Sequence, residues 1–253
     1  MELENGKIAV LIDAENTQPK KLAAVLQELS MYGHIITKRA YSNWKKSSSD
    51  WEDVIRDNAI TPIQQFANTK GKNSSDITLV IDAMDLLYSK KYDTFVIVSS
   101  DSDFTKLVTR IHDDEIKVIG VGEMKTPQSL IKACDDFIFI ENLDKEDEET
   151  SDKSSDNKEA LSDKKMLASD KVKLLKQLRV IVENDKYSDD EGWVNIGTAG
   201  NLIKRTDPSF DSRTFGFPTL LKLLKSLDKS VEVRQRNNAN GRAVINEFRL
   251  KNK

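Results

Sequence analysis

The sequence predicts an α/β protein with a parallel sheet covered by helices on both faces, followed by a small winged helix-turn-helix domain. In residues 1–143, short apolar segments of strand length alternate with segments whose apolar residues have helical spacing. A charged stretch poor in large apolar residues follows at 144–165, and residues 166–253 read as helices followed by two strands. Alternation of strands and helices favours a parallel sheet with both faces buried.

The N-terminal part contains six segments with the length and apolar content of buried strands. They are residues 7–12, 35–41, 60–66, 94–98, 117–121 and 137–140. The segments between them carry apolar residues three and four apart, which predicts helices at 19–31, 50–59, 75–88, 104–112 and 127–133. Most crossovers between such strands should be right-handed.

The stretch at 144–165 is rich in Asp, Glu, Lys and Ser. Because it cannot bury enough apolar surface to offset the entropy lost on ordering, we expect a flexible acidic linker. The linker divides the chain into one domain at 1–143 and a second at 166–253.

The C-terminal domain shows helical patterns around 172–181, 199–203 and 217–227, and strands are predicted at 231–236 and 243–250. The residues that join the two strands, 237–241, are mostly Asn and Gly, which tolerate the positive φ that a hairpin turn needs. Residues 166–253 contain 17 Lys and Arg against 11 Asp and Glu. This basic balance makes the C-terminal domain the better electrostatic partner for nucleic acid, although it also fits an ordinary solvated surface.

Composition excludes several other classes of site. One cysteine, Cys134, rules out a disulfide within the chain and fits a reducing cytoplasm. With two histidines beside it, a zinc site built from Cys and His would lack ligands. The apolar runs are too short to span a bilayer, so we expect a cytoplasmic protein without membrane attachment.

Acidic residues stand where two of the predicted strands end. Asp13 closes the first strand, with Asn16 three residues later, and Asp101 and Asp103 follow the fourth. Functional groups collect beyond the carboxyl ends of parallel strands, and Asp76, at the start of a helix, is expected to face the same place. Clustered carboxylates need protons, hydrogen bonds or a cation, and Mg²⁺ and Mn²⁺ prefer oxygen ligands. The pattern suggests a metal site that acts on phosphates.

Each of these residues also has a purely structural interpretation. An Asp after a strand commonly serves a turn, and Asp101 with Asp103 could cap the helix that follows. Asp82 lies six residues beyond Asp76, about 240° further around the helix, so we rank it second.

Candidates for substrate contact lie at the end of the second predicted strand and just before the helix that carries Asp76. Arg39 and Lys72 could contact phosphate, and Tyr41 could stack on a base. The alternative for Tyr41 is packing beneath a loop.

Four motifs occur in the order and spacing of a known family. They are VLIDAEN at 10–16, KNSSDI at 72–77, IDAMDLL at 81–87 and VSSDSDF at 98–104, and ACDDFI follows at 133–138. This part of the chain resembles the NYN domain of the PIN-like nuclease superfamily, and within it the LabA-like (DUF88) subgroup. The sequence has Ser-Ser-Asp where many members have Ser-Gly-Asp, which alters the backbone beside the site.

The resemblance implies a PIN-like Rossmannoid fold, a carboxylate site for Mg²⁺ or Mn²⁺ and ribonuclease activity. By motif, the family's metal-site positions fall on Asp13, Asn16, Asp76, Asp101 and Asp103. Asp13 and Asp101 would be the main ligands of one or two ions. Asp76 and Asp103 would bind directly or through water, or orient the nucleophile, and Asn16 would hold a ligand or the phosphate. The implied reaction is hydrolysis of a phosphodiester by metal-activated water.

The C-terminal part, over 168–250, resembles the LOTUS (OST-HTH) domain, a winged-helix module associated with RNA binding and in some members with protein binding. Arg234 and Arg236 fall on its predicted wing, where salt-sensitive phosphate contacts would fit. An ordinary solvated face is the alternative.

The sequence therefore favours a metal-dependent endoribonuclease with a tethered RNA-binding module. Its expected substrate is single-stranded RNA. One rival is a non-catalytic RNA-binding or regulatory adaptor with the same fold. Another is a phosphatase of the haloacid dehalogenase type, which needs Asp-x-Asp directly after the first strand. This chain has Asp13-Ala14-Glu15 there and places Asp-x-Asp after the fourth strand.

Overall fold

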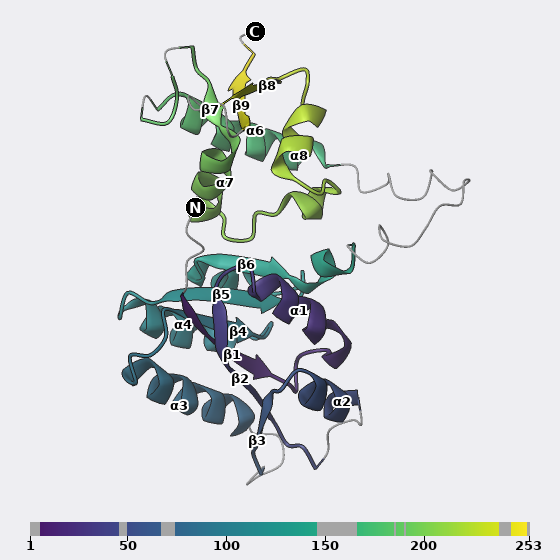
Figure 1. Ribbon diagram of the computed structural model, residues 1–253, viewed down its shortest axis with the longest axis vertical. Helices are drawn as coiled ribbons and strands as arrows, with labels where there is room; N and C mark the ends of the chain where they lie inside the picture. The colour runs from purple at the N-terminus through teal and green to yellow at the C-terminus, as the bar shows by residue number, and fades with distance from the viewer. Residues whose placement is uncertain are drawn as a thin grey trace, which may run out of the picture. The chain divides into compact units, whose positions relative to one another are not determined.

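The computed structural model describes residues 6–45, 50–66, 74–145, 166–184, 186–189, 191–237 and 244–251. They form two compact units divided near residue 151 (Figure 1). Within the described ranges, no helix is both long and apolar enough to cross a membrane.

The N-terminal unit is built on a six-stranded parallel sheet, as the sequence predicts. The strand order is β3-β2-β1-β4-β5-β6. The strands are β1 Lys7–Asp13, β2 His34–Ser42, β3 Thr61–Gln64, β4 Thr94–Val98, β5 Lys117–Gly122 and β6 Asp136–Phe139. The winding of the chain reverses between β1 and β4, and open α/β sheets bind ligands outside the carboxyl ends of strands at such a point.

Helices cover both faces of this sheet (Figure 1). Strand β1 supplies buried side chains to both faces. Ala9 and Leu11 pack with α3, α4 and α5, whereas Ile8, Val10 and Ile12 pack with α1 and α2. This alternation is that of a strand buried on both sides. The helices are α1 Leu22–Leu29, α2 Asp50–Asp57, α3 Ser74–Tyr88, α4 Thr105–His112 and α5 Gln128–Ala133.

Two predicted helices are interrupted by tighter turns. The helix expected at 19–31 begins as a 3₁₀ turn at Pro19–Lys21 and ends at Leu29. The chain then passes through Gly33, whose φ is +155° and where a Cβ would lie 2.4 Å from the Gly6 carbonyl oxygen, so a side chain cannot be accommodated there. The second interruption is a 3₁₀ turn at Ser102–Phe104, which precedes α4.

At the edge of the sheet formed by β5 and β6, an aromatic ring packs directly against a glycine. The Phe137 ring lies over Gly120, where an added Cβ would stand 2.4 Å from the ring. Cys134 is buried beside them and serves as a small core residue. A 3₁₀ segment, Ile140–Lys145, closes the unit and includes the first two residues of the predicted linker. The remainder of that linker, 146–165, lies outside the described residues.

The C-terminal unit packs three helices against a small antiparallel sheet of order β7-β9-β8 (Figure 1). Its elements are α6 Ala168–Val182, β7 Val194–Asn195, α7 Ile196–Thr206, α8 Leu220–Ser226, β8 Val231–Asn237 and β9 Val244–Leu250. Strands β8 and β9 pair from Val231 with Leu250 to Asn237 with Val244. The structure adds the short strand β7 to the predicted elements. Residues 238–241 of the expected turn, and the first residue of the strand predicted at 243–250, lie outside the described ranges.

Candidate active site

The Asp13 carboxylate is buried at the carboxyl end of β1, with 1% of the residue exposed. Its Oδ2 accepts hydrogen bonds from Asn16 Nδ2 at 2.9 Å and from Ser99 Oγ at 2.8 Å. Its Oδ1 is buried without a hydrogen-bond partner among the described residues. Burial raises the pKa of Asp13, and the bonds from Asn16 and Ser99 oppose that rise. An unsatisfied buried carboxylate oxygen is costly, so this atom calls for a ligand.

Strands β1 and β4 are neighbours, as expected from the acidic residues that follow each of them. The Ser99 hydroxyl connects the ends of the two strands. Ser99, just after β4, donates to Asp13 and accepts a hydrogen bond from the Asp101 backbone N at 3.1 Å. Asp101 Oδ1 in turn accepts from the Asp103 backbone N at 2.9 Å and caps the 3₁₀ turn. Asp101 therefore has the predicted structural role as a cap, fulfilled by one of its two oxygens.

The first turn of α3 brings a further carboxylate to the same place. The pKa of Asp76 is raised to about 6, first by burial and then by the negative charges of Asp13, Asp101, Glu15 and Asp103. The four carboxylates named from the sequence, together with Glu15, therefore lie within electrostatic range of Asp76.

Glu15 was absent from the sequence-predicted set. Its Oε1 accepts hydrogen bonds from Ser75 Oγ at 2.7 Å and from the Asn43 backbone N at 3.3 Å. It therefore ties the loop after β1 to the first turn of α3. The available signal was its position two residues beyond Asp13, inside the acidic segment itself.

Asp82 belongs to a different network on the same helix. Its carboxylate forms an ion pair with Arg39 and accepts a hydrogen bond from the Tyr41 hydroxyl. Tyr41 is fully buried, and both burial and this bond raise its pKa. The expectation that Tyr41 stacks on a base is wrong, because no part of its ring reaches solvent. Arg39 is committed to Asp82, and Lys72 lies outside the described residues.

A pocket of about 330 Å³ opens beside the acidic residues. The loops that follow β1, β4 and β5 form its wall, with Asn16, Ser100, Asp101, Ser102, Lys125 and Pro127 as lining residues. In the described part of the chain, no three His, Cys, Asp or Glu side chains form a complete metal-ligand set. The all-oxygen donors and the unsatisfied Asp13 Oδ1 nevertheless fit Mg²⁺, which is usually held by one or two carboxylates and retains several waters.

The order of these acidic residues on a parallel sheet has a counterpart among known families. A model described as the NYN domain matches residues 7–141, just over half of the chain. This protein belongs to the NYN domain family. A second model, the OST-HTH/LOTUS domain, matches residues 165–243. Both resemblances drawn from the motifs are confirmed, and the NYN domain places the chain in the PIN-like nuclease superfamily.

Three individual proteins are similar to part of this chain. An uncharacterised protein of Methanocaldococcus jannaschii is 29% identical over 137 residues, which are 53% of this chain and 54% of that protein. A structure of unknown function from Vibrio parahaemolyticus covers 55% of this chain and 96% of its own, with 21% identity and a TM-score of 0.46. An uncharacterised Nitrosomonas europaea protein covers 41% and 93%, with 27% identity and a TM-score of 0.31. This chain spans about half the length of the archaeal protein, and none of the three is assigned an activity.

In the OST-HTH domain, the two predicted phosphate-binding arginines are engaged with acids. Arg234 Nε lies 2.8 Å from Glu247 Oε2, and the same guanidinium reaches Asp189 and Glu191 at 3.2 and 3.4 Å. Arg236 lies 2.8 Å from the other Glu247 oxygen, and Glu247 is buried. Arg234 therefore holds the hairpin to the loop before β7, and both wing arginines are paired with Glu247.

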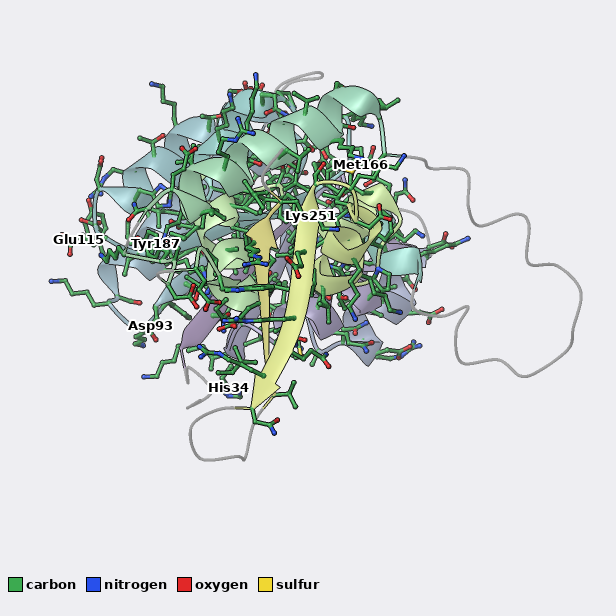
Figure 2. All side chains as sticks on the ribbon, turned by 90° about the horizontal axis from the view of Figure 1, so that it is seen from above. His34, Asp93, Glu115, Met166, Tyr187 and Lys251 are labelled. Atoms are coloured by element: carbon green, nitrogen blue, oxygen red, sulfur yellow. The ribbon has the colours of Figure 1, made fainter. Side chains whose placement is uncertain are left out.

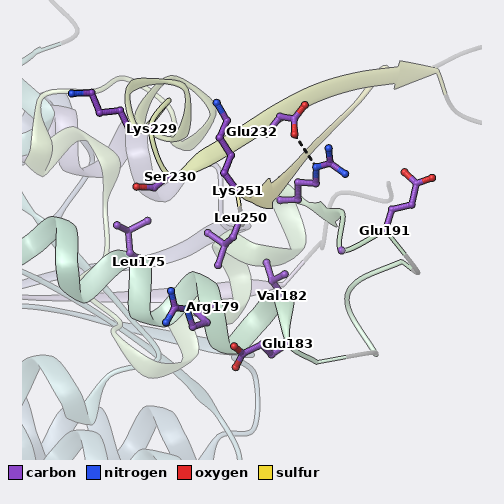
Figure 3. Close-up of a pocket in the computed structure, with 12 residues that line it drawn as sticks. Leu175, Arg179, Val182, Glu183, Glu191, Lys229, Ser230, Glu232, Leu250 and Lys251 are labelled. Atoms are coloured by element: carbon purple, nitrogen blue, oxygen red, sulfur yellow. Dashed lines mark hydrogen bonds and ion pairs between the residues drawn. The ribbon is translucent and has the colours of Figure 1, made fainter. Parts of the chain in front are cut away.

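A hollow of about 1030 Å³ in the OST-HTH domain lies between α6 and the β8–β9 hairpin (Figure 3). Leu175, Val182 and Leu250 give it an apolar part. Its charged residues are of both signs, and one pair, Arg249 with Glu232, closes at 2.8 Å. This mixed lining gives no preference for an anion.

Proposed function

We propose that this protein is a metal-dependent endoribonuclease that hydrolyses phosphodiester bonds of single-stranded RNA, with Mg²⁺ or Mn²⁺ as its ion and the OST-HTH domain as an RNA-binding module. Membership of the NYN family supports nuclease chemistry, since PIN-like nucleases generally use divalent ions, and the OST-HTH domain supports RNA binding. A cytoplasmic location and a protein partner for the OST-HTH domain remain predictions.

The observation that carries the proposal is the meeting of the Asp13, Glu15, Asp76, Asp101 and Asp103 carboxylates at the β1–β4 edge, with Asp13 Oδ1 unsatisfied. Such a group of carboxylates repels a phosphodiester as well as its own members, so a cation would stabilise both the carboxylates and the bound substrate. RNA, which is a polyanion, could not approach these carboxylates without the positive charge of that cation.

Each residue then has a role that its contacts support. Asp13 and Asp101 would be the main ligands, and Ser99 and Asn16 fix the Asp13 carboxylate by donating to its Oδ2. When bound, the ion would polarise the scissile phosphate and acidify a water molecule. Asp76, partly buried beside these carboxylates, would take a proton from the attacking water or bind the ion directly or through water. Asp103 would orient that water or bind through it.

A cleavage assay tests the proposal. Labelled single- and double-stranded RNA and DNA are incubated with Mg²⁺, Mn²⁺ or EDTA. Asp13→Asn and Asp101→Asn should each reduce the rate by about 100-fold or more, as expected for groups that stabilise transition-state charge. Asp113→Asn, on the exposed end of α4, is the matched control and should cleave normally. Unchanged cleavage by both site variants would show that the assigned site is wrong.

A non-catalytic RNA-binding protein is the second candidate. It is favoured by the absence, within the described ranges, of a complete set of three metal-ligating side chains. The same assay separates the two, because this candidate binds RNA and leaves it intact in either ion.

A further inference from the structure

The pocket beside the acidic residues has a wall whose position is fixed by hydrogen bonds. In the loop after β5, the Glu123 backbone N donates to Ser100 Oγ at 2.9 Å, and the Met124 backbone N donates to Glu141 Oε1 at 2.8 Å. The buried Thr126 hydroxyl donates to the Glu123 carbonyl at 2.6 Å. The loop is thereby anchored to the end of β4, next to Asp101.

This loop brings a lysine to the pocket. Lys125 lines it together with Asn16 and Asp101, and 75% of its side chain is exposed. Its Nζ lies 2.7 Å from Glu123 Oε2, which is its ion-pair partner. Among the described residues that line the pocket, Lys125 carries the one positive charge.

A strand of RNA entering this edge of the sheet meets carboxylates from β1, β4 and α3. A metal ion can neutralise one phosphate, but the neighbouring phosphates of the strand stay exposed to the same repulsion. Arg39, expected to meet phosphate, is engaged by Asp82. Among the described residues that line the pocket, Lys125 is the group that can compensate a neighbouring phosphate.

We propose that the pocket formed by Asn16, the 100–102 loop and Lys125 is a subsite for the RNA phosphate next to the scissile one, with Lys125 as its cation. This inference rests on the proposed function. Lys125 exchanges Glu123 for the phosphate, which is feasible because exposed ion pairs are weak and a lysine ammonium is a flexible point charge. The fixed backbone of the loop keeps the ammonium within reach of the pocket.

Steady-state cleavage of a short RNA by the full chain tests the subsite across a range of salt concentrations. Lys125→Ala should raise KM about fourfold at 0.15 M salt and lower the salt slope by about 0.7, the value of one phosphate contact to a single strand. We expect kcat to stay within about twofold of wild type, since the substitution leaves the carboxylates in place. Lys132→Ala, on the exposed side of α5, is the matched control and should change neither KM nor the slope.

A second variant acts in the opposite direction. Glu123→Gln releases Lys125 from its ion pair and should lower KM, and this gain should vanish in the Glu123→Gln/Lys125→Ala double variant. The inference is overturned if Lys125→Ala matches Lys132→Ala. It is equally overturned if the gain from Glu123→Gln persists without Lys125, because the effect would then come from net charge alone.

Binding of the same RNA, measured by fluorescence anisotropy in Mg²⁺, separates this inference from the proposed function. Cleavage by the wild type with no effect of Lys125→Ala on KM or binding leaves the function standing and removes the subsite. Absence of cleavage in either ion removes the function, and a fourfold weaker binding of Lys125→Ala than of Lys132→Ala would then show that Lys125 binds an RNA phosphate at a site that does not cleave.

Discussion

Asp76 and Asp82 both lie on helix α3. Replacing each of them by Asn should shift the free energy of unfolding in opposite directions. The pKa of Asp76 is raised to about 6 from 3.8, by burial and by neighbouring carboxylates. The folded protein therefore binds a proton at this group more tightly than the unfolded chain. This favours folding fully below pH 3.8, and the benefit is lost as the pH rises through 6.

The magnitude follows from that shift. Two units of pKa correspond to about 3 kcal/mol, and solvent screening of this half-buried carboxyl reduces the expected effect to about 1 kcal/mol. Asp76→Asn should thus raise the free energy of unfolding by about 1 kcal/mol at pH 7.5 and by close to zero at pH 4. Asp82→Asn should lower it by about 2 kcal/mol, since it weakens the ion pair of Arg39 and the hydrogen bond of Tyr41.

Chemical unfolding of the wild type and both variants at pH 4, 5.5 and 7.5, in EDTA, measures these differences. Mn²⁺ should then stabilise the wild type more than Asp76→Asn, because the ion relieves the repulsion that the substitution has already removed. Carboxylate repulsion at the start of α3 is refuted if Asp76→Asn is less stable than wild type at pH 7.5. A gain at pH 4 equal to that at pH 7.5 would refute it as well.

Three further substitutions test other contacts. Arg234→Ala should destabilise the OST-HTH domain by about 3 kcal/mol, because it removes a partner of the buried Glu247, and thermal unfolding of that domain measures the loss. Tyr41→Phe should cost about 1 kcal/mol in chemical unfolding and leave KM for RNA unchanged, since the side chain does not reach the substrate. Gly120→Ala should cost about 2 kcal/mol in the same measurement, because its Cβ would enter the Phe137 ring.

The strands and the main acidic residues could be predicted from the sequence for one physical reason. A strand buried on both faces is apolar along its whole length, so β1 and β4 are visible from local composition alone. Parallel strands end at the same edge, so this rule puts Asp13 and the Asp101 loop at one edge of the sheet, where β1 and β4 are neighbours.

Pairings between distant residues could not be predicted in this way. Arg39 and Asp82 are 43 residues apart, and nothing local shows that this arginine meets a carboxylate in place of a phosphate. The same holds for Arg234 with Glu247, which are 13 residues apart across the hairpin. Lys125 lies in a loop whose place depends on hydrogen bonds to Ser100 and Glu141, and these form only in the folded chain.

Strand β1 contributes to both hydrophobic cores and ends at Asp13. Inserting or deleting a single residue within it would exchange the side chains between the two faces and move the carboxylate away from the β4 edge. Stability and chemistry are therefore inseparable in this strand. Changes that adjust the substrate or the rate have to occur in the loops after β1, β4 and β5, which can vary in length and charge while the sheet keeps its register.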